Sequence, residues 1–166
     1  MKKASKRKSS LILLGWREWA TLPDLRVRNI KAKLDTGART STLHAFRLQR
    51  YTRDGRAMVR FEVHPVQRSR AATVAVEATV LDERKVRNSG GGIEIRPVIE
   101  TTLELAGERW TIELTLTRRD EMGFRMLLGR QALRGRILID PSASFEGRGR
   151  PNSALLRVKP QSQEEE

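Results

Sequence analysis

Hydrophobic and polar residues alternate along most of the chain, with the period of a strand that has one buried face. The alternation predicts one strand within residues 11–22 and a second over residues 25–34. In the second segment, Ile30, Ala32 and Leu34 fall on one face, and charged or polar residues fall on the other. Both segments are therefore expected to line a core.

Tight turns divide the following sequence into hairpins. Residues 54–55, Asp-Gly, separate two alternating runs within residues 43–66, and this dipeptide is a strong signal for a two-residue hairpin turn. Residues 106–107, Ala-Gly, separate a long strand from its return strand within residues 93–117. We expect a hairpin at each position.

The remaining segments complete an almost helix-free pattern. A strand is expected over residues 72–81, followed by a polar, glycine-rich loop over residues 82–92. Short apolar strands at 124–129 and 135–140 flank residues 130–134, which are long enough for about one helical turn. Many short strands punctuated by turns predict an all-β domain, a closed or nearly closed β-barrel with one short helix near the C-terminus.

Length and composition limit the organisation of the chain. Its 166 residues suit one domain, expected over residues 11–156 between a disordered basic tail, 1–10, and a disordered tail, 157–166. Cysteine is absent, which excludes a disulfide framework and a thiolate zinc site. The apolar run at residues 11–14 is too short for a signal peptide, so we expect a cytoplasmic protein without a membrane span.

The charge balance favours anionic partners. Lys and Arg number 33 against 20 Asp and Glu, a net charge of +13. Nucleic acid, an acidic peptide and an anionic lipid surface would all be attracted, although arginine-rich strand faces are more often simply solvated. The eight aromatic residues do not interleave with basic ones, so a nucleic-acid stacking platform is not expected.

Asp35 is the first candidate for chemistry, because it follows a strand and precedes Gly37, which permits a tight turn. One interpretation is an Asp that bonds its own backbone, and the other is an acid held on a rigid loop. Aspartic peptidases need two carboxylates that face one water and share a proton. The sequence has one such motif; Asp140 lacks the following Thr/Ser-Gly and is expected to cap a turn.

Three strings carry a resemblance to a known family: KAKLDTGARTSTLHA at residues 31–45, IRPVIETTLELAG at 95–107 and MLLGRQALRGRILIDP at 126–141. In this order they resemble the bacterial family named ATP-dependent zinc proteases, also described as retropepsin-like, over about residues 15–144. The resemblance implies a retropepsin-like (acid protease) barrel and a homodimeric aspartic peptidase that hydrolyses peptide or isopeptide bonds. It also implies an association with ATP-grasp ligases, which add amino-acid tags.

The resemblance assigns roles residue by residue. Asp35 would be the catalytic residue, paired with Asp35 of a second copy across a two-fold axis. Retropepsins often carry an acid where this chain has Arg39; a cation there favours ionised carboxylates and indicates an acidic peptide substrate. The residues that would support the site are Thr36, Gly37, Ala38, Arg39, Leu128 and Gly129, and the candidate flap is Ser89, Gly90, Gly91 and Gly92.

Two alternatives stay open: a non-catalytic member of the same fold that binds a peptide or partner, and the zinc-dependent peptidase that the family name implies. Catalytic zinc needs about three protein ligands, and the sequence offers His44 and His64 without Cys or a His-Glu-x-x-His helix. We therefore expect no metal and no cofactor, and His44 is expected to be a packed strand residue. Without a phosphate-binding loop, any ATP requirement would belong to a partner. Arg96-Pro97 is expected to end a strand segment or lie at an edge.

Overall fold

The computed structural model describes residues 10–66, 72–87, 90–118, 123–147 and 157–158. Strands make up most of this part of the chain, and its helical segments are the 3-10 turn η1 (Pro23–Leu25) and the helix α1 (Arg130–Leu133). The strands are β1 (Leu11–Gly15), β2 (Arg17–Leu22), β3 (Val27–Leu34), β4 (Ser41–His44), β5 (Phe46–Arg53), β6 (Arg56–Val63), β7 (Val74–Thr79), β8 (Asp82–Arg87), β9 (Ile93–Leu105), β10 (Glu108–Thr117), β11 (Met126–Leu128), β12 (Ile137–Asp140) and β13 (Arg157–Val158).

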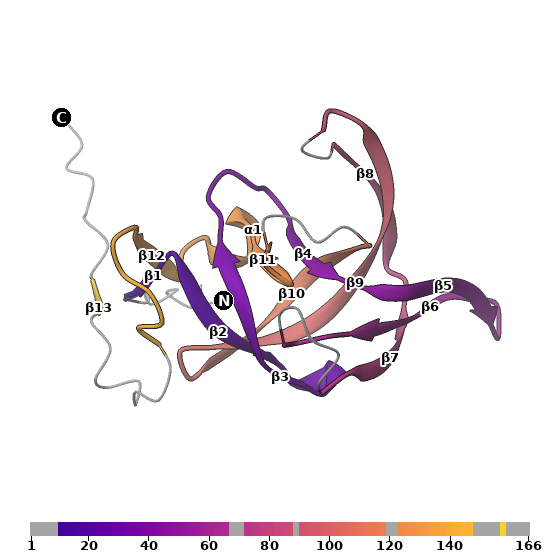
Figure 1. Cartoon of the computed structure of the whole chain (residues 1–166), viewed down its shortest axis with the longest axis horizontal. Coiled ribbons are helices and arrows are strands. Elements are labelled where there is room, and N and C mark those ends of the chain that lie inside the picture. The colour runs from indigo at the N-terminus through magenta and orange to yellow at the C-terminus, as the bar shows by residue number, and fades with distance from the viewer. Residues whose placement is uncertain (1–9, 67–71, 88–89, 119–122, 148–156, 159–166) are drawn as a thin grey trace, which may run out of the picture.

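Six of these strands close into a barrel (Figure 1). They are hydrogen-bonded in the order β10-β4-β11-β3-β2-β9, and β9 pairs with β10 to complete the ring. Fully buried side chains such as Leu22, Ile30, Leu43, Leu103 and Leu114 form its core. The predicted all-β barrel with one short helix near the C-terminus is confirmed.

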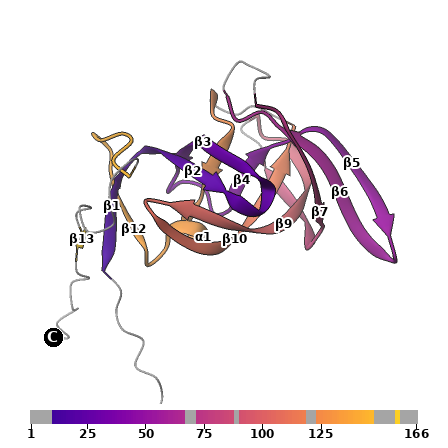
Figure 2. The ribbon, with the colours of Figure 1, turned by 90° about the horizontal axis from the view of Figure 1, so that it is seen from below.

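Two smaller sheets extend the barrel. β12, β1 and β13 form one of them, and β5, β6 and β7 form the other at the opposite end of the molecule (Figure 1). The expectation of a single strand within residues 11–22 is wrong, because the segment divides at Trp16 into β1, which belongs to one of these sheets, and β2, which belongs to the barrel. The β5–β6 hairpin projects well beyond the barrel (Figure 2). β13 contains the first two residues of the segment that was expected to be a disordered tail; the rest of that segment and residues 1–9 lie outside the described residues.

Both predicted hairpin turns are present. Asp54 and Gly55 have φ of 51° and 74°, and Ala106 and Gly107 have φ of 53° and 76°. Two consecutive residues with positive φ form the mirror-image turn whose twist matches that of the flanking strands. The β5–β6 and β9–β10 hairpins therefore follow from local sequence.

The prediction of a loop over residues 82–92 is wrong in its first half. Residues 82–87 form β8, which pairs antiparallel with residues 93–98 of β9. β8 is the edge strand of its sheet and exposes most of its charged side chains, so it lacks the apolar alternation of a half-buried strand. Its pairing partner, rather than its own composition, makes it a strand.

Arg96-Pro97 does not end a strand, because β9 runs through both residues, and the alternative expectation, an edge position, is confirmed. Pro97 pairs opposite Glu83 of β8, and the pairing of β9 with β10 begins only at Val98. A proline without an N–H group is tolerated there because β9 has a neighbour on one side only. Beyond this point β8 and the first part of β9 form a two-stranded hairpin that stands away from the barrel (Figure 1).

Candidate functional site

Asp35 is the first residue after β3, and its backbone and side chain are both fixed. Its N–H donates to the carbonyl of Leu128 in β11 (2.8 Å), and its Oδ1 accepts the N–H of Gly37 (2.8 Å). The carboxylate is 25% exposed, with Lys33 Nζ lying 3.9 Å from Oδ2. Asp35 therefore caps its own turn and also lies on a loop that is hydrogen-bonded to β11, so the two interpretations of this residue do not exclude each other.

The helix α1 holds the loop that follows Asp35. The N–H groups of Arg130 and Gln131 donate to the carbonyls of Ala38 (2.8 Å) and Arg39 (3.1 Å). The Arg130 guanidinium also donates to the carbonyl of Thr36 (2.9 Å). Backbone groups of the loop are thus bound by a neighbouring element, which makes the loop a rigid support.

Gly129 connects β11 to α1 where only a glycine fits. A Cβ at this position would lie 2.7 Å from the carbonyl carbon and oxygen of Thr40, closer than real Cβ contacts. The Gly129 N–H donates to Ser41 Oγ (3.1 Å), which ties the junction to β4. The structure thus brings together the two segments, 36–39 and 128–129, that the sequence placed around Asp35.

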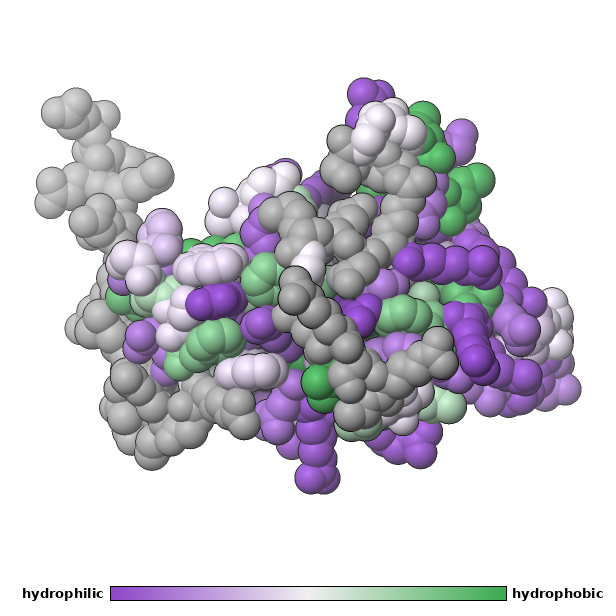
Figure 3. Space-filling view, in the orientation of Figure 1, coloured by the Kyte–Doolittle hydropathy of each residue, from purple (hydrophilic) through white to green (hydrophobic). Residues whose placement is uncertain are grey.

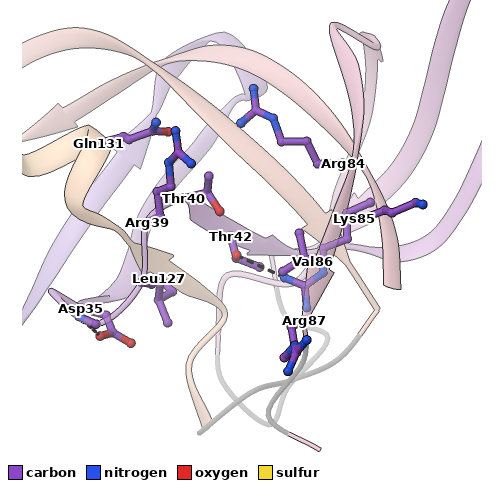
Figure 4. Close-up of a pocket in the computed structure, with 13 residues that line it drawn as sticks. Asp35, Arg39, Thr40, Thr42, Arg84, Lys85, Val86, Arg87, Leu127 and Gln131 are labelled. Carbon is purple, nitrogen blue, oxygen red and sulfur yellow. Dashed lines mark hydrogen bonds between the residues drawn. The ribbon is translucent and has the colours of Figure 1, made fainter. Parts of the chain in front are cut away.

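A cavity of about 850 Å³ opens beside Asp35 (Figure 4). Asp35 lies at one end of the view, and side chains of β8 lie on the opposite side. Among the described residues that line this cavity, Asp35 is the only one with a carboxylate. The cationic side chains that line it are Arg39, Arg84, Lys85, Arg87 and Arg96. Within the described residues, one chain therefore presents a single acid in a basic cavity.

Residues of the β8–β9 hairpin form one wall of the cavity, and the candidate flap glycines belong to the same hairpin. Gly90, Gly91 and Gly92 lie between the two strands, with φ of 83° at Gly91, whereas Ser89 lies outside the described residues. Arg50 of β5 donates to Glu83 Oε1 (2.9 Å) at the base of the hairpin.

A second ion pair fixes the same hairpin to the barrel. Arg84 Nη2 of β8 donates to Glu113 Oε2 of β10 (2.6 Å). The hydrogen bonds from Arg50 to Glu83 and from Arg84 to Glu113 raise the pKa of both guanidinium groups. Two ion pairs thus join the β8–β9 hairpin to β5 and to β10 of the barrel.

Arg96 lines the cavity, although no role was predicted for it from the sequence. Its side chain lies in the cavity wall although the residue is only 2% exposed. Arg96 Nε donates to Glu94 Oε2 (3.0 Å), and Nη1 lies 3.5 Å from Thr42 Oγ1. The sequence pattern that could have indicated its position is the spacing of Glu94 and Arg96. Two residues apart in a strand, they place opposite charges on one face of an otherwise apolar segment.

The histidines do not form a zinc site with the groups around them. His44 is buried in β4, accepts a hydrogen bond at Nδ1 from Arg125 Nη1 (3.1 Å) and stacks on Phe46. His64 stacks on Phe46 as well, and its Nε2 lies 3.3 Å from a carboxylate oxygen of Glu62. Within the residues that the structure describes, no three His, Cys, Asp or Glu side chains gather to hold a metal. These residues therefore do not fit the zinc hydrolase that the family name implies.

Comparison with known proteins bears on the family. The family model described as RimB-like, retropepsin-like aspartic endopeptidase RimB, matches residues 13–148. A probable alpha-L-glutamate ligase of Parasynechococcus marenigrum is 50% identical over 135 residues, 81% of this chain and 29% of the relative. Another of that name from Shewanella halifaxensis is 47% identical over 133 residues, 80% of this chain and 29% of the relative. This chain thus spans less than a third of the length of these curated relatives.

A solved structure is similar as well. Lpg0085 of Legionella pneumophila, a protein with unknown function, matches with a TM-score of 0.68 and 28% identity, over 82% of this chain and 98% of that one. In the part of the chain that the structure describes, no helix is long and apolar enough to cross a membrane. The retropepsin-like family expected from the three sequence strings is confirmed by the match over residues 13–148.

Proposed function

Because the chain belongs to the RimB-like family of retropepsin-like aspartic endopeptidases, we propose that it hydrolyses peptide bonds with Asp35 as its catalytic residue. One observation carries the proposal: a carboxylate on a loop fixed by β11 and α1 opens into a cavity of about 850 Å³ walled by a hairpin. Rigid placement of an acid beside a substrate-sized cavity is what general acid–base catalysis requires.

The second carboxylate comes from another copy of the chain in this proposal. Asp35 is the only acid among the described residues that line the cavity, and the reaction needs two. In a two-fold dimer, one Asp35 removes a proton from a water molecule while the oxygen of that water attacks the peptide carbonyl carbon. The other, protonated Asp35 donates a hydrogen bond to the carbonyl oxygen. The C–N bond then breaks, and the first Asp35 passes the proton that it took from water to the amine nitrogen, so that a carboxylic acid and an amine leave and both Asp35 side chains return to their starting state.

An acidic peptide is the substrate that the charges favour. Five cationic side chains and one carboxylate are among the described residues that line the cavity. Arg84 and Arg96 are ion-paired with Glu113 and Glu94, and the exposed Arg39, Lys85 and Arg87 add positive charge that attracts negative side chains. The relatives named probable alpha-L-glutamate ligase contain a segment similar to this chain within a longer protein. We infer that the substrate is a glutamate-rich peptide or tag of the kind such a ligase would make, and that an ATP-grasp ligase is the functional partner.

Replacing Asp35 by Asn tests the function, because Asn keeps the turn but removes the ionisable group. Cleavage of a hexaglutamate peptide, followed by mass spectrometry, should fall about 10³-fold in Asp35→Asn. Asp140→Asn is the matched control: Asp140 Oδ1 accepts the N–H of Ser142 (2.9 Å) in a similar turn and does not line the cavity. The control should cleave at the rate of the unmodified chain.

Equal cleavage by the unmodified chain and Asp35→Asn would make Asp35 structural and refute the proposal. If neither cleaves any peptide of a broad library and an acidic peptide still binds, the chain is a non-catalytic peptide-binding member of the fold.

A further inference from the structure

The cations of the cavity fall into two kinds. Arg39, Lys85 and Arg87 are exposed, and the Arg84 side chain is 30% exposed. Arg96 is only 2% exposed although it lines the same cavity. Exposed charges are screened by salt over about 10 Å, whereas a buried charge is screened much less. The two kinds of cation should therefore contribute differently to ligand binding.

A polar network holds the Arg96 guanidinium in one orientation. Glu94 accepts from Arg96 Nε at Oε2 (3.0 Å) and from Thr117 Oγ1 of β10 at Oε1 (3.1 Å). On the cavity side, Arg96 Nη1 reaches Thr42 Oγ1, which is hydrogen-bonded to Thr115 Oγ1 (3.0 Å). The network joins the part of β9 between the middle of the β8–β9 hairpin and its turn to β4 and β10 of the barrel.

This arrangement suits the recognition of a carboxylate. A guanidinium is planar and always charged, and it can serve several acceptors at once, including both oxygens of one carboxylate. Burying a charge is costly unless the group is paired and hydrogen-bonded, and Glu94 provides that pairing. The guanidinium is thus already oriented before a ligand arrives.

We propose that Arg96 is the specificity-determining residue of the cavity: it binds the side-chain carboxylate of one substrate residue. Glu94 and Thr42 are positioning residues that fix its guanidinium. The proposal rests on the proposed function for its substrate class and adds a specific subsite to the general basic field. The exposed cations attract any acidic peptide, while Arg96 distinguishes an acid from its amide at one position, or at two symmetry-related positions when the peptide spans two copies.

The experiment measures binding, so that it does not depend on catalysis. Fluorescence anisotropy gives the Kd of labelled hexaglutamate, and of the six peptides with a single Glu→Gln change, for the Asp35→Asn chain. At one or two positions the change should weaken binding about 10- to 100-fold, as expected for a lost charged hydrogen bond. Adding Arg96→Gln should abolish this positional preference.

Lys85→Gln is the matched control, since Lys85 is an exposed cation of the same cavity. Lys85→Gln should weaken the binding of all peptides by the same factor, and this effect should nearly vanish in 0.5 M salt. The positional preference due to Arg96 should persist at that salt concentration. A melting curve checks that each variant folds. Because Arg96→Gln leaves Glu94 without its buried partner, the double variant Glu94→Gln/Arg96→Gln removes both charges and should also lack the preference.

The proposal is overturned if folded Arg96→Gln or the double variant keeps the positional preference, or if Arg96→Gln and Lys85→Gln weaken all peptides alike. The proposed function survives that result if the unmodified chain still cleaves hexaglutamate. Conversely, an Arg96-dependent preference in a chain that cleaves nothing supports this inference and refutes the peptidase.

Discussion

Asp35 and Asp140 show how little a single residue's local geometry says about its role. Each carboxylate accepts the N–H two residues later, at 2.8 Å and 2.9 Å. At Asp140, hydrogen bonds from the Ser142 hydroxyl and N–H lower the pKa of the carboxyl. Asp35 differs in its surroundings, since it opens into the basic cavity. Tertiary neighbours, which no local motif contains, separate the turn cap from the candidate catalytic acid.

A buried acid away from the cavity gives a prediction for stability against pH. Glu18 of β2 is 1% exposed, and its carboxylate accepts the N–H groups of Glu146 (2.8 Å) and Gly147 (2.7 Å). Burial outweighs these hydrogen bonds and raises the pKa of Glu18 above its ordinary value of 4.5. The folded state therefore binds this proton more tightly than the unfolded chain does, and ionised Glu18 destabilises the fold.

The unmodified chain should thus gain stability relative to Glu18→Gln as the pH falls from above the raised pKa of Glu18 towards 4.5. Urea unfolding of both proteins at several pH values measures the difference in their free energies of unfolding. The comparison cancels the titration of other groups. A difference that is constant, or that moves the other way, would contradict the assignment of burial as the dominant effect.

At the scale of elements, the apolar strands were predictable and the charged hairpin was not. β3 and β11 carry buried side chains at alternate positions, so sequence alone located the strands around Asp35. β8 exposes its charges at the edge of the sheet, and only its pairing with β9 makes it a strand. The place of Arg96 in the cavity was not predicted for a related reason. Its burial depends on Glu94 and on barrel strands that are distant in sequence.

At the junction of β11 and α1, the single methyl group added by Gly129→Ala should lower the free energy of unfolding. In Gly129→Ala the new Cβ would meet the Thr40 backbone at 2.7 Å, and backbone at this place is held by β11, β4 and α1. We expect a loss of about 1–3 kcal/mol in the free energy of unfolding, measured in urea, because overpacked sites must shift.

Gly147→Ala is the control for this loss. Its Cβ would meet mainly Ala106 Cβ at 3.1 Å, a milder contact, and should cost clearly less. If Gly129→Ala and the unmodified chain are equally stable, the backbone at the junction can shift to accommodate the Cβ. Gly129 is then not needed to hold the loop of Asp35.

At the scale of the whole molecule, the closed barrel holds the loop of Asp35, and the chain carries a net charge of +13. Hydrophilic side chains cover the projecting β5–β6 hairpin, where several arginines are exposed (Figure 3). The sequence predicted the basic bias, the barrel and the family. It did not predict that five cations surround the cavity of Asp35, because Arg39, β8 and Arg96 are brought together only by the fold.

The central claim is that catalysis needs Asp35 from two copies, and mixing tests it most directly. Unmodified and Asp35→Asn chains are combined in equal amounts, allowed to exchange subunits, and assayed on hexaglutamate at constant total protein. If mixed dimers are inactive, random pairing leaves about one quarter of the dimers with two carboxylates, so activity should fall to about one quarter. Activity of about one half, as expected when each copy acts alone, would contradict the account.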